Sequence, residues 1–355
     1  MPPLAPMLAK PADEVPDGEG WLYEPKWDGF RCIVFRDGEE VLLASRNERP
    51  FNRYFPELLD PIRAQFPQRC VVDGEIVVPA ASGAGLDFDA LQQRIHPAES
   101  RVRRLAVETP SAFIAFDLIA VDGESLLGVT LAARRARLDD VLSGLESPLH
   151  LTPATTEAAV ARDWFARFEG AGLDGVLAKP LPGVYTPGER SLVKVKHRRT
   201  ADCVVAGYRR HKDGKGVGSF LLGLYDDESV LHHVGVASGI NARQRASLLA
   251  EIAPLEEGAL VNHPWREWAD AVAHAAGGRM PGAPSRWNAN KDLSWSPLRL
   301  ERVCEVEFTQ LEGRRFRHNA HFLHWRPDRS PHDCRYDQLD VAVPATLREV
   351  LEAPR

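Results

Sequence analysis

The sequence is poor in cysteine, and none of its cysteines forms a C-x-x-C pair. There are five, an odd number, and they are widely scattered along the chain. Disulfide frameworks are typical of chains with an even number of cysteines, and zinc sites are typical of close pairs such as C-x-x-C. The sequence therefore argues against both kinds of site. We expect small core residues at Cys32, Cys70, Cys203, Cys304 and Cys334.

Long apolar runs are also missing. No segment approaches the roughly 20 apolar residues that span a bilayer, and prolines interrupt the opening MPPLAPMLAKPADEV too often for a secretory signal. We therefore expect a cytoplasmic protein without a membrane partner. The 355 residues are 44% apolar and 26% charged, which is ordinary for a globular chain but more than one core holds comfortably. Two domains are expected.

The sequence has no large excess of charge of either sign. Its formal net charge is −6, which by itself does not favour nucleic acid as a partner. Phosphate contact depends on local charge, however, and two runs are strongly basic. Either run is typical of a solvated face or of a phosphate-binding surface. The two runs are RSLVKVKHRR at 190–199 and GRRFRHNAHFLHWRPDR at 313–329.

The first 199 residues mix strand and helix patterns. Residues 30–45 predict a hairpin, because an Asp-Gly pair separates two apolar runs. Apolar periodicity predicts further strands at 70–78, 112–121, 175–179 and 191–196, and helices at 88–95, 131–142 and 157–170. This mixture indicates an α+β domain of mixed antiparallel sheets and helices rather than a regular doubly wound domain.

From residue 200 onward the pattern changes to short strands around one helix. Strands are expected at 202–210, 218–225, 230–237, 304–311, 315–318 and 320–326, with a helix at 241–252. This order predicts a β-barrel of the oligonucleotide-binding (OB) type. The expected domains are therefore 1–199 and 200–355. Residues 257–297, rich in tryptophan, are too long for a turn and predict a mobile loop with a short helix or a functional insert.

Several charged residues interrupt strands that otherwise look buried. Glu75, Asp117 and Asp174 lie in or at the start of such strands, and Lys179 closes one of them. Burial of an isolated charge is costly, so these residues should be paired, bind a metal or lie on the floor of a cleft. Carboxylates suit Mg²⁺, which binds one or two acids together with substrate phosphates. The alternative for the set is a group of salt bridges that stabilises an ordinary fold.

Lysines in the same segments point to phosphate. The two-residue period of a strand puts Lys194 and Lys196 on one face, and two adjacent ammonium groups favour an anion between them. Lys26 lies between Pro25 and Trp27. Desolvation and the neighbouring lysines would depress its pKa and leave a neutral amine able to attack phosphorus. A lysine that extends its ammonium into solvent is the alternative.

Read in order, these segments resemble the motifs of the covalent nucleotidyltransferases, which include ATP-dependent DNA ligases, RNA ligases and mRNA capping enzymes. The chain is most similar to the small two-domain bacterial DNA ligases called ligase C. This resemblance implies an ATP-grasp-like adenylation domain followed by an OB barrel. The matching segments are KWDGFR (26–31), SRN (45–47), VDGE (72–75), AFDLI (115–119), DGVLAK (174–179), LVKVK (192–196) and RPDR (326–329).

The resemblance implies an activity and a role for each matching residue. It implies an enzyme that seals nicks in duplex DNA during repair through a lysyl-adenylate on Lys26 and a DNA-adenylate. Glu24 would meet the adenine edge and Phe116 would stack on the base. The nucleotide-binding residues it implies are Glu24, Arg31, Arg46, Glu75, Phe116, Lys179, Lys194, Lys196, Arg326 and Arg329. The implied ligands of Mg²⁺ or Mn²⁺ are Glu75 and Asp174, and the implied DNA contacts are Arg46, Arg198 and Arg199.

The resemblance also implies the surroundings in which the protein acts, and it leaves alternatives open. It implies a monomer that associates with the nucleoid when on DNA and works with other repair proteins. Asp174 stands where the family commonly has glutamate, and Arg329 stands where it commonly has lysine. An RNA ligase, a capping-type guanylyltransferase and a catalytically silent nick-binding module are the alternatives. No residue in the sequence distinguishes ATP from GTP, or deoxyribose from a 2′-hydroxyl.

Overall fold

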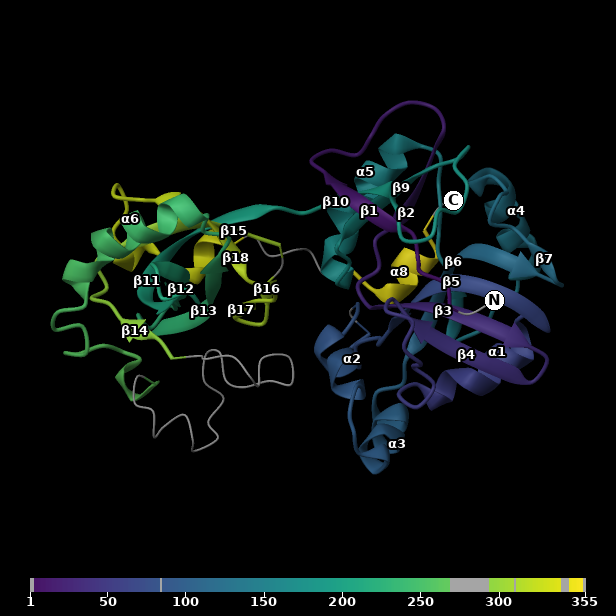
Figure 1. Cartoon of the computed structure of the whole chain (residues 1–355), viewed down its shortest axis with the longest axis horizontal. Helices are drawn as coiled ribbons and strands as arrows, with labels where there is room; N and C mark the ends of the chain where they lie inside the picture. Colours follow the sequence, from purple (N-terminus) through teal and green to yellow (C-terminus); the bar gives the residue numbers. More distant parts are fainter. Residues whose placement is uncertain (1–2, 84, 269–293, 310, 340–344, 354–355) are drawn as a thin grey trace. The chain divides into compact units, whose positions relative to one another are not determined.

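The apolar runs of the first 200 residues form two β-sheets in this computed structural model (Figure 1). The structure describes residues 3–83, 85–268, 294–309, 311–339 and 345–353. The smaller sheet has the order β1 (Leu8–Ala12), β10 (Arg190–Lys196), β9 (Gly175–Pro180) and β2 (Trp21–Pro25). The larger sheet runs β4 (Glu40–Ser45), β3 (Phe30–Asp37), β5 (Arg69–Val77), β6 (Ala112–Val121) and β7 (Glu124–Ser125), with β8 (Leu149–Leu151) paired to β6.

The two sheets hold each other in place through shared apolar side chains. Ile33 and Val71 of the larger sheet pack in one cluster with Leu192 of β10. The hairpin predicted at 30–45 and the strands predicted in this half of the chain are confirmed. Most pairings are antiparallel, but β1 lies parallel to β10. The mixed antiparallel character of the expected α+β domain is therefore confirmed.

Helices surround the two sheets of the first unit. The helices predicted at 88–95, 131–142 and 157–170 are confirmed as α2 (Phe88–Arg94), α4 (Leu131–Val141) and α5 (Ala158–Arg167). Thr130 accepts a hydrogen bond from the Ala133 N–H and so caps α4 at its N-terminus. The sequence did not predict α1 (Leu59–Gln65), α3 (Glu99–Glu108) or α8 (Leu347–Leu351).

The second half of the chain forms a closed barrel. Among the described residues, five strands pair around it in the order β11, β12, β13, β18 and β15, and β15 pairs again with β11. Helix α6 (Ala242–Ile252) lies between β13 and β15 in sequence, which is the arrangement of an OB fold. The predicted OB barrel is confirmed. Its strands are β11 (Arg199–Arg210), β12 (Val217–Tyr225), β13 (Leu231–Ser238), β15 (Val303–Phe308) and β18 (Ala320–Trp325), with β14 (Ser296–Pro297), β16 (Leu311–Glu312) and β17 (Arg315–Phe316) beside them.

The division of the chain differs from the expected domains of 1–199 and 200–355. The first unit consists of Met1–Lys196 together with Ala342–Arg355, and the second unit is His197–Val341. The physical reason is that the last helix, α8, buries its apolar side against the first unit. Val350 is fully buried in a cluster that contains Trp164 and Phe168. The last helix thus packs with the first unit, although the expected division placed it in the second domain.

The tryptophan-rich stretch at 257–297 is described only at its two ends. Residues 269–293, on which the expected loop or insert depends, lie outside the described residues. At the first end, Trp265 is buried in the barrel core and its Nε1–H donates to the Leu231 carbonyl at 2.9 Å.

Within the described ranges, no helix combines the length and apolar character needed to cross a membrane.

Candidate active site

Lys26 follows β2 directly and is tied to the start of β9 through its backbone. Its N–H donates to the Gly175 carbonyl at 2.8 Å, and its carbonyl accepts from the Asp174 N–H at 3.1 Å. Gly175 has φ +137, and a Cβ there would lie 2.0 Å from the Val195 carbonyl oxygen. Glycine is therefore required where these three segments approach. The result is that Asp174 lies beside Lys26.

The Asp174 carboxylate binds two ammonium groups. Lys26 Nζ and Lys196 Nζ each lie 2.6 Å from its Oδ2 atom. Burial alone would raise the pKa of Asp174, but the two lysines lower it to about 2. The neutral Lys26 amine that the sequence led us to expect stays a prediction.

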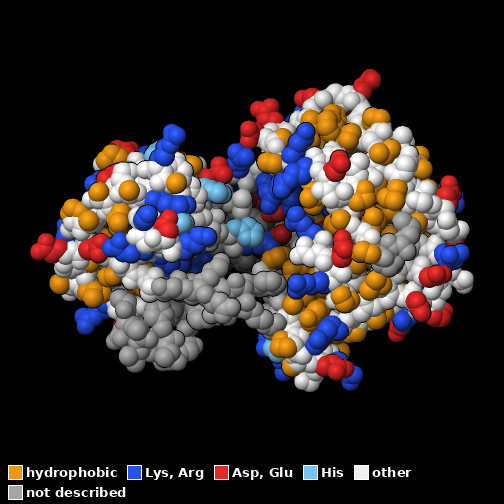
Figure 2. Space-filling model, in the orientation of Figure 1, with side chains coloured by type: hydrophobic (Ala, Val, Ile, Leu, Met, Phe, Trp, Pro, Cys, Tyr) orange, Lys and Arg blue, Asp and Glu red, His pale blue; other side chains and the backbone are white. Residues whose placement is uncertain are grey.

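The Lys26 side chain lines a cavity of about 410 Å³ in the first unit. The side chain is 18% exposed, so it is neither sealed in the core nor free in solvent. Among the described residues that line this cavity, cations outnumber acids, and Figure 2 shows lysine and arginine side chains gathered over β10 and β1. Such a lining suits a polyanion. The cations are Lys26, Lys194, Lys196, Arg31, Arg46 and Arg190, and the acids are Glu24 and Glu75.

Lys194 shows the effect of this crowding. Its ammonium is partly desolvated and lies near Lys196, Lys26 and Arg190, and these causes lower its pKa. The lysines at 194 and 196 lie on the same side of β10 and line the cavity, while Val195 is buried on the other side. The strand period that predicted a shared face for the two lysines is therefore confirmed.

Arg31 and Glu75 are paired neighbours on β3 and β5. Arg31 donates through Nε and Nη2 to the two oxygens of Asp73, at 2.6 Å each, and the Tyr185 hydroxyl donates to Asp73 at 2.7 Å. Burial raises the pKa of Glu75 to about 7, against the opposing influence of Arg31 and Lys26. Asp73 thus neutralises Arg31, whereas Glu75 faces the cavity with weaker compensation.

Glu24 and Phe116 also line the cavity, whereas the predicted Lys179 does not line it and is buried in contact with both. Lys179 Nζ lies 2.6 Å from Glu24 Oε2 and 4.7 Å from the centroid of the Phe116 ring. Arg31 lies over the same ring, 4.4 Å from its centroid. The Phe116 side chain is 3% exposed and Glu24 is 1% exposed. Stacking of a base on Phe116 stays a prediction, and it requires the ring to become more accessible than it is in this structure.

The predicted residues of the second unit have their own local partners. Arg326 Nη1 donates to Asp202 Oδ1 at 2.9 Å, and Arg329 Nε donates to Asp202 Oδ2 at 3.1 Å. One acid that the sequence did not single out therefore holds both arginines of the RPDR segment. Arg198 is exposed and Arg199 is partly buried at the start of β11.

Two family models match the chain, and together they cover most of it. The model described as "ATP dependent DNA ligase domain" matches residues 6–196, which is more than half of the chain. The model described as "ATP dependent DNA ligase C terminal region" matches residues 213–329.

The chain belongs to the ATP-dependent DNA ligase family.

Curated relatives and one solved structure agree with this membership. The ligase is 53% identical to DNA ligase C of Mycobacterium tuberculosis, over 100% of this chain and 99% of that protein, and 50% identical to DNA ligase C1 of Mycolicibacterium smegmatis, over 99% and 98%. It is 33% identical to the multifunctional non-homologous end joining DNA repair protein LigD of M. tuberculosis, over 71% of this chain and 32% of that protein. A Lig E DNA ligase structure has a TM-score of 0.55 at 15% identity, covering 91% of this chain and 99% of that one, and shows the shared fold.

Asp117 does not belong to the cavity of this ligase, which corrects the expectation that it joins Glu75 and Asp174 in one cleft. Its two oxygens accept from Arg134 Nε at 2.8 Å and Nη2 at 2.9 Å. Both side chains are buried. Asp117 thus forms a structural salt bridge that joins β6 to α4. A stabilising salt bridge is the alternative that the sequence left open for charges in apolar strands.

Arg190 and the segment 6–9 line the cavity but were not assigned to it from the sequence. Arg190 had a signal, because the two-residue strand period that aligns Lys194 and Lys196 also includes position 190. The segment 6–9 leads into β1, which pairs parallel to β10. Its position depends on a pairing between residues as distant in sequence as Leu8 and Arg190, which apolar periodicity does not reveal.

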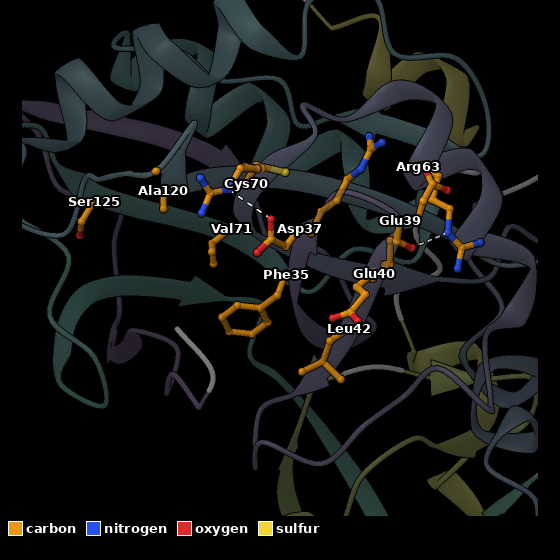
Figure 3. Close-up of a pocket in the computed structure, with 14 residues that line it drawn as sticks. Phe35, Asp37, Glu39, Glu40, Leu42, Arg63, Cys70, Val71, Ala120 and Ser125 are labelled. Carbon is orange, nitrogen blue, oxygen red and sulfur yellow. Dashed lines mark hydrogen bonds and ion pairs between the residues drawn. The ribbon is translucent and has the colours of Figure 1, made fainter.

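A second cavity, of about 740 Å³, lies against β3, β4 and β5 (Figure 3). Phe35, Val71 and Ala120 line its apolar part, and Asp37 on its rim pairs with Arg69 at 3.1 Å. It contains none of the predicted nucleotide-binding residues. Although this cavity is larger, Lys26 and the cations around it line the smaller one.

Replacement of Glu75 by glutamine should remove a pH dependence of stability. Because folding raises the pKa of Glu75 from 4.5 to about 7, this group contributes stability that is full below about pH 4.5 and is lost as the pH rises through about 7. Glu75→Gln, which resembles the protonated form, should therefore unfold like wild type at pH 5. At pH 8 it should be more stable than wild type, by at most about 3 kcal/mol.

Denaturant unfolding of both proteins at pH 5 and pH 8 measures this difference. Glu146→Gln is the matched control, because Glu146 is exposed and the same substitution should leave the two curves together at both pH values. Equal offsets between wild type and Glu75→Gln at pH 5 and pH 8 would contradict the assignment of a raised pKa to Glu75.

Proposed function

We propose that this ligase seals nicks in duplex DNA through a covalent adenylate on Lys26. The supporting observation is that one partly exposed lysine, bound to Asp174, lines a cavity with five further Lys or Arg side chains among the described residues. This arrangement offers a nucleophile together with counter-charges for a triphosphate. The membership of the ATP-dependent DNA ligase family supports ATP as the substrate.

Three phosphoryl transfers follow from this proposal. Lys26 Nζ loses a proton and forms a bond to the α-phosphorus of ATP, and the bond to pyrophosphate breaks. The adenylyl group then passes to the 5′-phosphate at the nick and frees the lysine. Finally the 3′-hydroxyl attacks that phosphate, the phosphodiester forms, and AMP leaves. Lys194 and Lys196 would neutralise charge on the α-phosphate, so the chain mainly positions groups and compensates charge.

The residues present suit a Mg²⁺ ion that arrives with the nucleotide rather than one held by protein alone. Among the described residues, no three His, Cys, Asp or Glu side chains gather as a metal-binding group. Magnesium commonly uses one or two carboxylates plus substrate phosphates and water. Glu75, which lines the cavity, and Asp174, which binds Lys26, would supply those carboxylates. When bound, the ion would neutralise charge on the transferred phosphoryl group.

A role in DNA repair and the contacts with DNA are also part of the proposal. The 33% identity to a relative named as a repair protein supports repair. Arg198 and Arg199 at the start of the second unit, and Arg46 in the cavity, would contact backbone phosphates. Arg326 and Arg329 would orient pyrophosphate as it leaves, which requires that they exchange Asp202 for the nucleotide.

A sealing assay with matched nicked duplexes tests the proposed substrate. One duplex carries DNA on both sides of the nick, and the other carries RNA at the same sequence. We expect the DNA nick to be sealed faster when ATP and Mg²⁺ are supplied, and GTP not to replace ATP. If Lys26 becomes adenylylated but only the RNA nick is joined, the proposed substrate is wrong.

A further inference from the structure

Glu24 is held by two cations that approach its two oxygens separately. Lys179 Nζ lies 2.6 Å from Oε2, and Arg135 Nη1 lies 3.4 Å from Oε1. Glu24 lies on β2, two residues before Lys26, and lines the same cavity. Because the carboxylate is 1% exposed, water does little to compensate its charge. The two cations are therefore what fixes its orientation.

Arg135 comes from α4, outside every segment that resembles a family motif. It is itself buried, at 6% exposure. Its Nη2 donates to the Thr152 carbonyl at 2.9 Å, and its Nε donates to Asp139 at 3.0 Å. A planar guanidinium bound on three sides has little freedom to turn. The orientation of Glu24 therefore depends, through Arg135, on where α4 lies.

Thr152 connects Arg135 to Trp27, the residue that follows Lys26. Its Oγ1 accepts a hydrogen bond from Trp27 Nε1 at 2.8 Å, and its carbonyl accepts from Arg135. The residues at 24 and 27 on either side of Lys26 are thus both connected to Arg135, one directly and one through Thr152. Loss of this arginine should disturb the base-facing side chain more than the nucleophile, whose own partner is Asp174.

The chemistry of the purine edge gives this arrangement a function. An ionised carboxylate only accepts hydrogen bonds, and its two oxygens offer about four lone-pair sites, of which the two cations use two. At position 6 adenine presents an amino donor, whereas guanine presents a carbonyl acceptor. A carboxylate that cannot turn away would bind the first and repel the second. Discrimination of this kind is strong when the site's polar group is left unpaired by the wrong substrate.

We propose that Arg135 is a positioning residue for purine recognition, because it fixes Glu24 as an acceptor toward the 6-amino group and thereby sets the preference for ATP over GTP. This inference rests on the proposed function, since it takes Glu24 as the group that meets the base edge. It adds a residue and a specificity mechanism that the family motifs do not contain.

The test measures nucleotidyl transfer to Lys26 as a function of ATP and of GTP concentration, in the full chain with Mg²⁺. Arg135→Gln should raise the KM for ATP about tenfold, with a smaller change in kcat. It should also lower the ratio of kcat/KM for ATP to that for GTP by about tenfold, the size expected for one charge-assisted hydrogen bond. Arg135→Lys keeps the charge and should restore part of the ratio.

Arg94→Gln is the matched control for an effect on stability alone. Arg94 is fully buried and binds Glu57 through Nη1 at 2.6 Å and Nη2 at 2.8 Å, and it does not line the cavity. It should lower the melting temperature and leave the ATP to GTP ratio unchanged.

Each outcome bears on one of the two claims. An unchanged ratio in a folded Arg135→Gln protein overturns the role of Arg135. If that variant does not fold, an unchanged ratio in folded Arg135→Met, which also removes the positive charge, overturns it instead. A wild-type protein that takes up neither nucleotide overturns the proposed function, and this inference with it.

Discussion

Replacement of Lys26 by alanine will abolish adenylate formation while the protein remains folded. Lys196, which shares Asp174, cannot take its place in the same position, because it enters from β10 whereas Lys26 enters from the end of β2. Loss of the nucleophile should lower the rate of adenylylation by at least about 10³-fold. Asp174 keeps Lys196 as a partner in the variant, so no buried charge is left without compensation.

Two further variants separate nucleophilicity from charge. Lys26→Arg keeps a cation beside Asp174, but a guanidinium does not lose its proton in proteins, so it should be as inactive as alanine. Lys10→Ala removes an exposed lysine of β1 and should leave the activity unchanged. Intact-mass measurement after incubation with ATP and Mg²⁺ detects the adenylate. Adenylate on Lys26→Ala protein at the wild-type level would place the nucleophile elsewhere in the chain.

The sequence predicted correctly those positions where one local rule determines which way a side chain points or whether it needs a partner. Alternation along 191–196 put Lys194 and Lys196 on one face, and the structure has them lining one cavity. The charged residue at the start of β9, Asp174, had to find a partner because its neighbours are buried, and it binds Lys26. Both inferences used the strand period and the cost of an unpaired charge, which do not depend on the arrangement of distant segments.

The positions that sequence reasoning missed depend on partners from other elements. Asp117 looked the same as Asp174 in sequence, but a helix 17 residues later supplies Arg134, which neutralises it away from the cavity. Arg135, the next residue, turns toward Glu24 instead. Neighbouring arginines on one helix thus serve two different acids. No periodicity in the sequence indicates which acid each arginine would meet, because that depends on how α4 packs on the sheet.

The last helix shows a signal that was present and not used. Thr346 and Glu349 form a capping box, with Glu349 N–H donating to Thr346 Oγ1 at 3.2 Å and Thr346 N–H donating to Glu349 Oε2 at 2.6 Å. The pattern T-x-x-E before apolar residues predicts such a helix start. It does not predict where the helix packs. That information lies in the apolar side chains of the first unit, which leave room for Val350.

Replacement of Val350 by aspartate should therefore destabilise the first unit and not the barrel. Val350 is fully buried beside Trp164 and Phe168, and a charge there must either remain unpaired or force α8 away from its cluster. Either outcome should lower the melting temperature of the first unit by about 10 °C. Arg348→Asp is the control on the same helix, because Arg348 is 82% exposed and its loss should shift the transition little.

Calorimetry can assign this effect to one unit, because each unit has its own apolar core. In Val350→Asp only the transition of the first unit should move to lower temperature, and the barrel transition should stay in place. A domain that ran from 200 to 355 would behave in the opposite way, since Val350 would then belong to the barrel core. A shift of the barrel transition alone would support the division expected from the sequence. A shift of the first unit's transition alone would show that the end of the chain completes the core of the first unit.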